Sequence, residues 1–140
     1  MHLRELQISS TTIRSLSDFF GNLTNMQDLN LSRCRKLESL PYSFMNLMKP
    51  RYLDLSYCNN LTLLRETLRN MCTLSHIDLT GCEGIEVLPS QIVGQRFLGT
   101  LNLWEPKNLI ELPVDIRKIR NLKNLNLQIE IFSKFEPLIS

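Results

Sequence analysis

The sequence lacks the features that mark membrane proteins and nucleic-acid-binding proteins. No uncharged apolar run approaches the roughly 20 residues that a membrane-spanning helix needs. The chain start, Met1 to Glu5, has no apolar stretch of the kind found in signal peptides. The net charge is only +2, and residues of both signs are interleaved along the chain. We therefore expect a cytosolic or nucleocytoplasmic protein with no membrane or nucleic-acid partner.

Motifs for nucleotide, metal and cofactor binding are also missing. Neither G-x-x-x-x-G-K-[S/T] nor G-x-G-x-x-G occurs, and no two cysteines form a C-x-x-C pair. Three of the four cysteines, Cys34, Cys58 and Cys82, instead recur every 24 residues. This spacing does not suit zinc, so we predict a buried, reduced and metal-free column, with Cys72 as a separate free thiol. We expect no cofactor.

A repeat that runs through nearly the whole chain is the strongest signal in the sequence. The middle apolar residue of each copy lies 23 and then 24 residues after the previous one. These six residues, predicted to be buried, are Leu6, Leu29, Leu53, Ile77, Leu101 and Leu125. The alternation around each of them predicts short strands near 5–8, 28–31, 52–55, 76–79, 100–103 and 124–127. Strands repeated at this interval must be parallel, because a crossover has to return the chain between them.

The return segments have their own pattern. Leu40-Pro41 is followed by Phe44 and Leu47, and Leu88-Pro89 by Ile92, a spacing that predicts one or two turns of helix or 3₁₀ helix. The predicted fold is therefore an α/β solenoid of about six coils of 23–24 residues, with the parallel strands on one side and the short helical turns on the other. Each coil would be stable only against a neighbouring coil.

The best copies of the repeat resemble a known family. Leu53-Asp54-Leu55-Ser56-Tyr57-Cys58 and the C-x-x-L-x-x-L-P ending are similar to the leucine-rich repeat, and especially to the cytoplasmic repeats of plant nucleotide-binding disease-resistance proteins. The resemblance covers roughly residues 3–127. It implies a horseshoe-shaped leucine-rich-repeat solenoid, with the strands on the concave side and the short helical turns on the convex side. It also implies a protein-interaction domain that acts in innate immunity, in sensing or in autoinhibition. Related repeats also occur in cytoplasmic scaffolds that bind Ras-type GTPases.

Four places depart from the pattern. Pro50 stands where a strand should begin, which requires that its missing N–H lie outside the strand ladder. Arg65 replaces the proline of the return, and Gln95 stands where other coils have Leu47 or Ile119, so we predict looser third and fourth returns. We assign 1–128 to the repeat array and 129–140 to a degenerate last repeat or C-terminal cap. In that segment Ile131, Phe135 and Leu138 predict a short helix that Pro137 limits.

The exposed strand face is the candidate site. Tyr52, Tyr57 and Trp104 are aromatic residues that the repeat does not need for its core, although Trp104 alternatively packs against its neighbouring loop. The predicted protein-binding residues are Tyr52, Asp54, Tyr57, His76, Asp78, Thr100, Asn102 and Trp104. Large aromatic residues such as Tyr52, Tyr57 and Trp104 often contribute most of the binding energy of an interface.

A catalytic reading is possible on paper, since His76, Asp78 and Thr100 can be drawn as a triad. A flat open sheet offers such a triad neither an enclosed pocket nor oxyanion donors, so we predict no enzymatic activity. The basic group Arg117, Lys118, Arg120 and Lys123 is interpreted as a solvated face, with a docking site for an acidic partner as the alternative.

The sequence thus predicts a non-enzymatic module for protein–protein interaction. Its partner would be a protein ligand or an intramolecular partner domain. By the resemblance alone, the role is ligand recognition or regulation in plant innate immunity. Two alternatives remain open: a scaffold for a Ras-type small GTPase, and a substrate-recognition adaptor of a larger enzyme complex.

Overall fold

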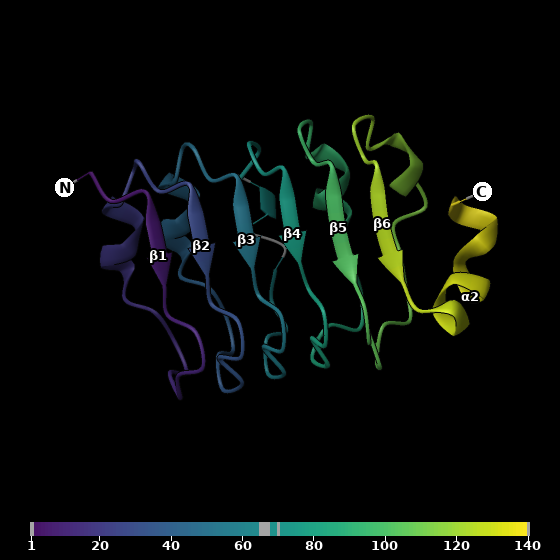
Figure 1. Ribbon diagram of the computed structural model, residues 1–140, viewed down its shortest axis with the longest axis horizontal. Helices are drawn as coiled ribbons and strands as arrows, with labels where there is room; N and C mark the ends of the chain where they lie inside the picture. The colour runs from purple at the N-terminus through teal and green to yellow at the C-terminus, as the bar shows by residue number, and fades with distance from the viewer. Residues whose placement is uncertain (1, 65–67, 70, 140) are drawn as a thin grey trace.

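Six short parallel strands form one sheet in the computed structural model, which describes residues 2–64, 68–69 and 71–139. The strands lie side by side in chain order (Figure 1). They are β1 (Glu5–Gln7), β2 (Asp28–Asn30), β3 (Tyr52–Asp54), β4 (His76–Asp78), β5 (Thr100–Leu103) and β6 (Asn124–Leu127). The register places Leu6, Leu29, Leu53, Ile77, Leu101 and Leu125 opposite one another. The predicted strands, their direction and their register are confirmed.

The return segments run behind the sheet in Figure 1 and contain 3₁₀ helices. These are η1 (Asp18–Asn22), η2 (Tyr42–Asn46), η3 (Ser90–Gly94) and η4 (Ile116–Lys118). Pro41 and Pro89 precede η2 and η3 with φ values of −64° and −67°, the range that the proline ring imposes. Ser17 precedes η1 and accepts a hydrogen bond from the Phe19 amide through its side chain. The predicted helical returns are therefore confirmed.

Burial of the six register residues depends on their place in the stack. Leu29, Leu53, Ile77 and Leu101 are buried, whereas Leu6 and Leu125 are only partly buried. The prediction that all six are buried was wrong at both ends. A side chain in an inner coil is covered by a neighbour on each side, and β1 and β6 each have one neighbouring strand.

The cysteine column is built from hydrogen bonds between coils. The Cys34 Sγ lies 2.8 Å from the Ile8 carbonyl oxygen, the Cys58 Sγ 3.1 Å from that of Leu31, and the Cys82 Sγ 2.9 Å from that of Leu55. Each thiol thus donates to the carbonyl of the coil before it. The three residues are buried and Cys72 is exposed, as predicted. Burial raises the pKa of the Cys58 thiol to about 12 and also raises the pKa of the Cys82 thiol.

A tight turn follows the strands and requires left-handed backbone. Ser10, Arg33, Tyr57, Gly81 and Glu105 share one repeat position, and all five have φ between 53° and 65°. Only one of them is glycine, the residue that adopts this conformation without cost. The amides of Arg33, Tyr57 and Gly81 donate to carbonyls of the next coil at 2.7, 2.6 and 2.8 Å. These regular bonds between coils hold the non-glycine residues in a conformation that otherwise costs about 1–2 kcal/mol each.

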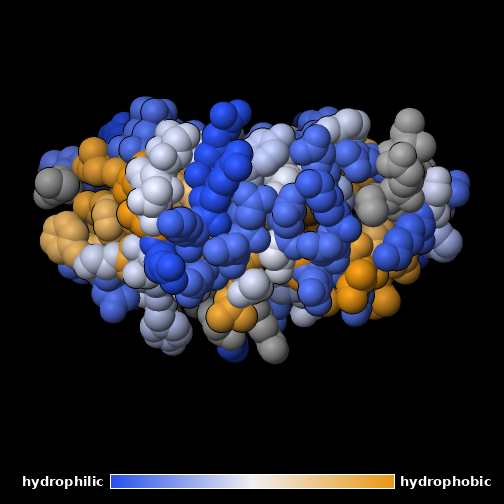
Figure 2. Space-filling view, turned by 90° about the horizontal axis from the view of Figure 1, so that it is seen from below, coloured by the Kyte–Doolittle hydropathy of each residue, from blue (hydrophilic) through white to orange (hydrophobic). Residues whose placement is uncertain are grey.

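Figure 2 views the molecule from this turn edge, which lies below the strands in Figure 1. The edge is hydrophilic across the middle of the molecule, and hydrophobic residues are visible toward the two ends. The pattern agrees with the partly buried apolar residues of the outer coils, among them Ile8, Ile13, Leu122 and Leu127. Apolar residues of the outer coils therefore stay partly accessible at the two ends of the stack.

Two of the four irregular positions are accommodated by hydrogen bonds. Pro50 precedes β3, and the ladder starts with the Arg51 amide on the Gln27 carbonyl, so the missing N–H lies outside it as predicted. Gln95 is buried and donates through Nε2 to the Leu68 carbonyl at 2.7 Å. Helix η3 has five residues, as η2 does, so the fourth return keeps the same helical turn. The looser packing expected of this return stays a prediction. Arg65 lies outside the described residues.

Helix α2 (Ile129–Ile139) follows the last strand at the C-terminal end of the stack. The prediction that Pro137 limits the helix was wrong, because Pro137 lies inside it and the helix continues to Ile139. A proline at this position cannot donate the backbone hydrogen bond to residue i−4, so the last turn has one such bond fewer. Phe135 is buried and Leu138 is partly buried against the core, while the Ile131 side chain lies outside the described residues.

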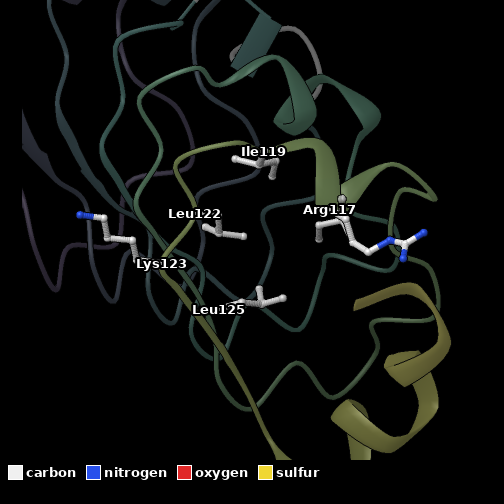
Figure 3. Close-up of a pocket in the computed structure, with 6 residues that line it drawn as sticks. Arg117, Ile119, Leu122, Lys123 and Leu125 are labelled. Carbon is white, nitrogen blue, oxygen red and sulfur yellow. The ribbon is translucent and has the colours of Figure 1, made fainter. Parts of the chain in front are cut away.

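A cavity remains beside this helix. It measures about 310 Å³ and is lined by apolar residues of the last coil, including Ile119, Leu122 and Leu125 (Figure 3). The side chains of Arg117 and Lys123 extend from it in opposite directions. The last coil is therefore incompletely covered, which explains the partial burial of Leu125.

A candidate recognition face

The side of the sheet that faces away from the core is the candidate site, and we call it the strand face. In β2, β3 and β4 the middle residue is buried and the two flanking residues are half-buried. The flanking residues therefore form two columns across the sheet. Six of the eight predicted site residues lie in these columns: Tyr52, Asp54, His76, Asp78, Thr100 and Asn102. The other two, Tyr57 and Trp104, lie just beyond the strands.

An aromatic pair stands near the middle of the strand face. The rings of Tyr52 and His76 are stacked, with centroids 4.5 Å apart and planes 19° from parallel. Their backbones pair across β3 and β4, so the sheet register fixes the stack. Burial raises the pKa of the Tyr52 hydroxyl, and the charges of Asp54, Asp78 and Asp28 raise it further. The pair is thus a preformed, partly exposed aromatic platform in a negative field.

The acidic residues of the second column also have a structural task. The Asp54 Oδ1 accepts hydrogen bonds from the Ser56 amide at 2.9 Å and from the Ser56 hydroxyl at 2.6 Å. The Asp78 Oδ1 accepts from the Thr80 amide at 2.9 Å in the same way. These bonds begin the turn after each strand and explain why the column contains Asn and Asp. Asp54 and Asp78 were predicted as protein-binding residues, but their role in the turn had not been predicted.

The residues of the drawn triad do not assemble for catalysis. The Asp78 Oδ2 accepts from the Asn102 amide group at 2.9 Å, so both carboxylate oxygens are already engaged. His76 instead stacks on Tyr52, and the Thr100 hydroxyl lies 3.3 Å from the Asn124 side-chain nitrogen. Asn126 donates to Asn102 in turn. Side-chain hydrogen bonds among Asp78, Asn102 and Asn126 therefore form a polar ladder across β4, β5 and β6.

Tyr57, predicted as a protein-binding residue that the core does not need, also contacts neighbouring turns. Its ring lies over Gly81, where an added Cβ would come within 2.5 Å of the ring carbon Cδ1. The Arg33 guanidinium lies 5.8 Å from the ring centroid, and the Tyr57 hydroxyl lies 3.5 Å from the Glu105 carboxylate. Tyr57 therefore connects four successive turns. We assign it a packing role in addition to any contact with a ligand.

Trp104 remains exposed on the other half of the site, with 48% of its surface accessible. It lines an open depression of about 460 Å³ with Thr80, Asn102 and Asn126. A second depression, of about 300 Å³, lies at the opposite end of the strand face and includes Tyr52, Glu5 and Asp28. Glu5 and Asp28 were not among the predicted site residues, although they occupy the same column as Tyr52.

The part of the chain that the structure describes contains no group of three or more His, Cys, Asp or Glu residues arranged to hold a metal ion. None of its helices is long and apolar enough to cross a membrane.

Comparisons with known proteins agree with this architecture. Residues 1–61 match the family model described as leucine rich repeat. No curated protein sequence matches the chain. The leucine-rich repeat domain of the type III effector XopL is similar in structure, with a TM-score of 0.64 and 19% identity over 99% of this chain and 66% of that chain. The plant peptide hormone receptor RGFR1, solved in complex with RGF2, gives a TM-score of 0.56 and 20% identity over 91% of this chain and 24% of that chain.

These findings confirm the predicted leucine-rich-repeat solenoid and support a leucine-rich-repeat domain. At these identities the structural likeness concerns the fold. The chain spans 66% and 24% of the length of the two solved chains. The function of the larger proteins is therefore not transferred with the fold.

Proposed function

We propose that this chain is a non-enzymatic protein-interaction module whose strand face recognises a protein ligand or an intramolecular partner domain. The stacked pair of Tyr52 and His76 carries the proposal, because the core does not need either ring. Large aromatic side chains on a rigid surface lose little conformational freedom on binding, and they are enriched among the residues that dominate interfaces. Repeat solenoids generally use extended surfaces of this kind to bind proteins.

The face divides into two parts with different chemistry. Around Tyr52 it is acidic and aromatic, with Glu5, Asp28 and Asp54 near the ring. Around Trp104 it is uncharged and amide-rich, with Asn102 and Asn126 beside the indole. A ligand that spans both parts would place a basic or aromatic group near Tyr52 and an apolar group near Trp104. RGFR1 was solved in complex with RGF2, which supports the use of this fold for ligand recognition.

The biological setting we propose is regulation or ligand sensing in plant innate immunity, in the cytosol or the nucleocytoplasm. The Leu53-to-Cys58 string and the Leu-Pro returns support it through their similarity to plant cytoplasmic repeats. The transcript provides a test. An upstream phosphate-loop domain in the same reading frame would support a resistance-protein role, whereas a transcript without one would favour a GTPase scaffold or an adaptor. Imaging of the tagged protein in plant cells would test the compartment.

The binding role is tested with a partner identified by a peptide or protein display library. Tyr52→Ala, His76→Ala and Trp104→Ala should each weaken its binding by roughly tenfold or more, since truncation of a dominant interface residue costs about 2 kcal/mol. Tyr42→Ala is the matched control, because Tyr42 is exposed on η2, behind the sheet. If Tyr42→Ala weakens binding as much as Tyr52→Ala does, the strand face is not the recognition surface.

A further inference from the structure

A basic cleft lies between the ends of the fourth and fifth returns, behind the sheet. It has a volume of about 570 Å³ and is the space bordered by Gly94, Arg96 and Phe97 of one coil and Lys118, Arg120 and Asn121 of the next. Each residue of the first group is 24 positions before its counterpart in the second. The Asn121 side chain donates to the Arg96 carbonyl at 2.5 Å and joins the two walls. The cleft is therefore a product of the repeat.

Two guanidinium groups in this cleft lack a counterion. Arg96 and Arg120 are exposed, and the described residues place no carboxylate within ion-pair distance of either. They occupy the same repeat position in adjacent coils and line the same cleft. Lys118 differs, since its Nζ lies 2.9 Å from the Asp115 carboxylate. An anionic group in the cleft would supply the counterion for both arginines.

The cleft also carries an apolar group. Phe97 is 61% exposed beside Arg96, although the repeat places Asn121 and Thr73 at the same position in neighbouring coils. Guanidinium groups beside an exposed ring suit an acidic segment that also presents an apolar side chain. A nucleic acid is less well suited, because its binding energy comes mainly from many phosphate contacts, and this cleft offers only Arg96, Lys118 and Arg120 as cations.

We propose that the basic cleft binds an acidic segment of a partner protein, with carboxylates on Arg96 and Arg120 and an apolar side chain against Phe97. The cleft and the strand face lie on different sides of the sheet, so the two surfaces can be occupied at the same time. This second contact does not depend on the identity of the strand-face ligand. The four clustered cations of the sequence thus separate in the fold: Lys118 and Arg120 join Arg96, while Arg117 and Lys123 line the cavity beside α2.

The probe for this proposal is a fluorescently labelled peptide rich in glutamate with one central leucine. Its binding to the full chain, followed by anisotropy, should weaken as salt rises, since exposed charge pairs are screened. Arg96→Ala and Arg120→Ala should each reduce affinity about fivefold, the upper range for a partly exposed ion pair. Phe97→Ala should reduce it as well. Arg35→Ala is the matched control, because it removes the same charge from the exposed turn edge of an early coil.

Gly94 offers a variant that blocks the cleft without changing its charge. A Cβ added there would meet no atom within 4 Å, so Gly94→Leu should fold normally and fill the space with its side chain. Binding of the acidic peptide should then be lost, with an unchanged circular dichroism spectrum and melting temperature. A glutamine-for-glutamate version of the peptide should not bind.

Three outcomes would overturn the proposal. The first is equal binding of the glutamate and glutamine peptides. The second is equal affinity of Arg96→Ala, Gly94→Leu and Arg35→Ala. The third is displacement of the peptide by oligo-uridylate at a lower concentration than by unlabelled peptide, which would assign the cleft to single-stranded nucleic acid. None of these outcomes bears on the strand-face ligand.

Discussion

The inner and the outer coils of this protein share one residue pattern but differ in how much of it they bury. Leu53 is fully buried in the third coil, while Leu6, at the same repeat position in the first, is only partly buried. The two residues have the same chemistry and the same local backbone, since both lie in the middle of a three-residue parallel strand. The difference comes from the neighbouring coils. Stability in this chain is therefore a property of pairs of coils.

The largest effect should come from the inner core. Leu53→Ala should lower the free energy of unfolding by about 2–5 kcal/mol, because it leaves a cavity among residues that cannot collapse to fill it. Leu6→Ala should cost less than half as much, since its side chain is already partly in contact with water. Urea denaturation of both variants would measure the difference. Equal losses would show that coil position does not control burial energy.

A smaller loss is expected at the turn edge. Gly81→Ala introduces a side chain at φ 65° and against the Tyr57 ring, so it should cost about 2–3 kcal/mol. In a Tyr57→Ala background only the backbone cost of about 1–2 kcal/mol remains. A double-mutant cycle would show this coupling. Additive costs would mean that the ring of Tyr57 does not lie over Gly81 in solution.

The sequence predicted most of the architecture because the repeat fixes it. A repeat interval of 23 and then 24 residues determines the strands, their parallel register and the cysteine column. The burial of side chains in the first and last coils could not be predicted from the repeat. Leu125 carries the same pattern as Leu101, and its exposure depends on how closely helix α2 packs against the last coil.

The candidate site was harder to predict because a side chain can have two roles. Asp54 and Asp78 lie on the strand face as predicted, but their oxygens bind the following turn. The left-handed turn was not predicted because its position holds non-glycine residues such as Arg33, Tyr57 and Glu105. Five glycines at this repeat position would have indicated the turn. The basic cleft was missed because Arg96 is far from Arg120 in the sequence, although the repeat position was available to connect them.

The thiol column predicts a response to alkaline pH. The pKa of Cys58 is raised from 9.0 to about 12, so the folded state holds this proton more tightly than the unfolded state. Its contribution to stability is complete below pH 9 and is lost as the pH rises through about 12. Denaturant midpoints measured from pH 8.5 to 11 should therefore fall less steeply in Cys58→Ala than in the unaltered chain. Identical slopes would contradict the buried neutral thiol.

Reactivity separates the same groups at neutral pH. Cys72 is exposed and should react first with an aromatic disulfide reagent, whereas the three buried thiols should react only as the chain unfolds. A Cys72→Ser variant should thus show almost no rapid reaction with the reagent. Rapid reaction of further protein thiols in that variant would show that the cysteine column opens in the native state.

The smallest effect on stability is expected on the strand face. Trp104→Ala should change the free energy of unfolding by no more than about 0.5 kcal/mol, because nearly half of the side chain is already exposed. Tyr57→Ala should cost more, since its ring contacts the neighbouring turns. Thermal melts of the two variants would rank them. The reverse order would assign the packing role to Trp104.

Hydrogen exchange of single backbone amides tests the dependence on neighbouring coils most directly. The Leu55 and Leu79 amides bond to carbonyls of the next coil at 2.9 Å, and so does the Ile8 amide of the first coil. If stability comes from pairs of coils, Leu55 and Leu79 should exchange slowest, and Ile8 and Asn124 should exchange at least about tenfold faster, since outer coils open locally at lower free energy. Equal protection of Ile8 and Leu55 would contradict the account, because the same hydrogen bond would then be equally stable with one neighbouring coil or two.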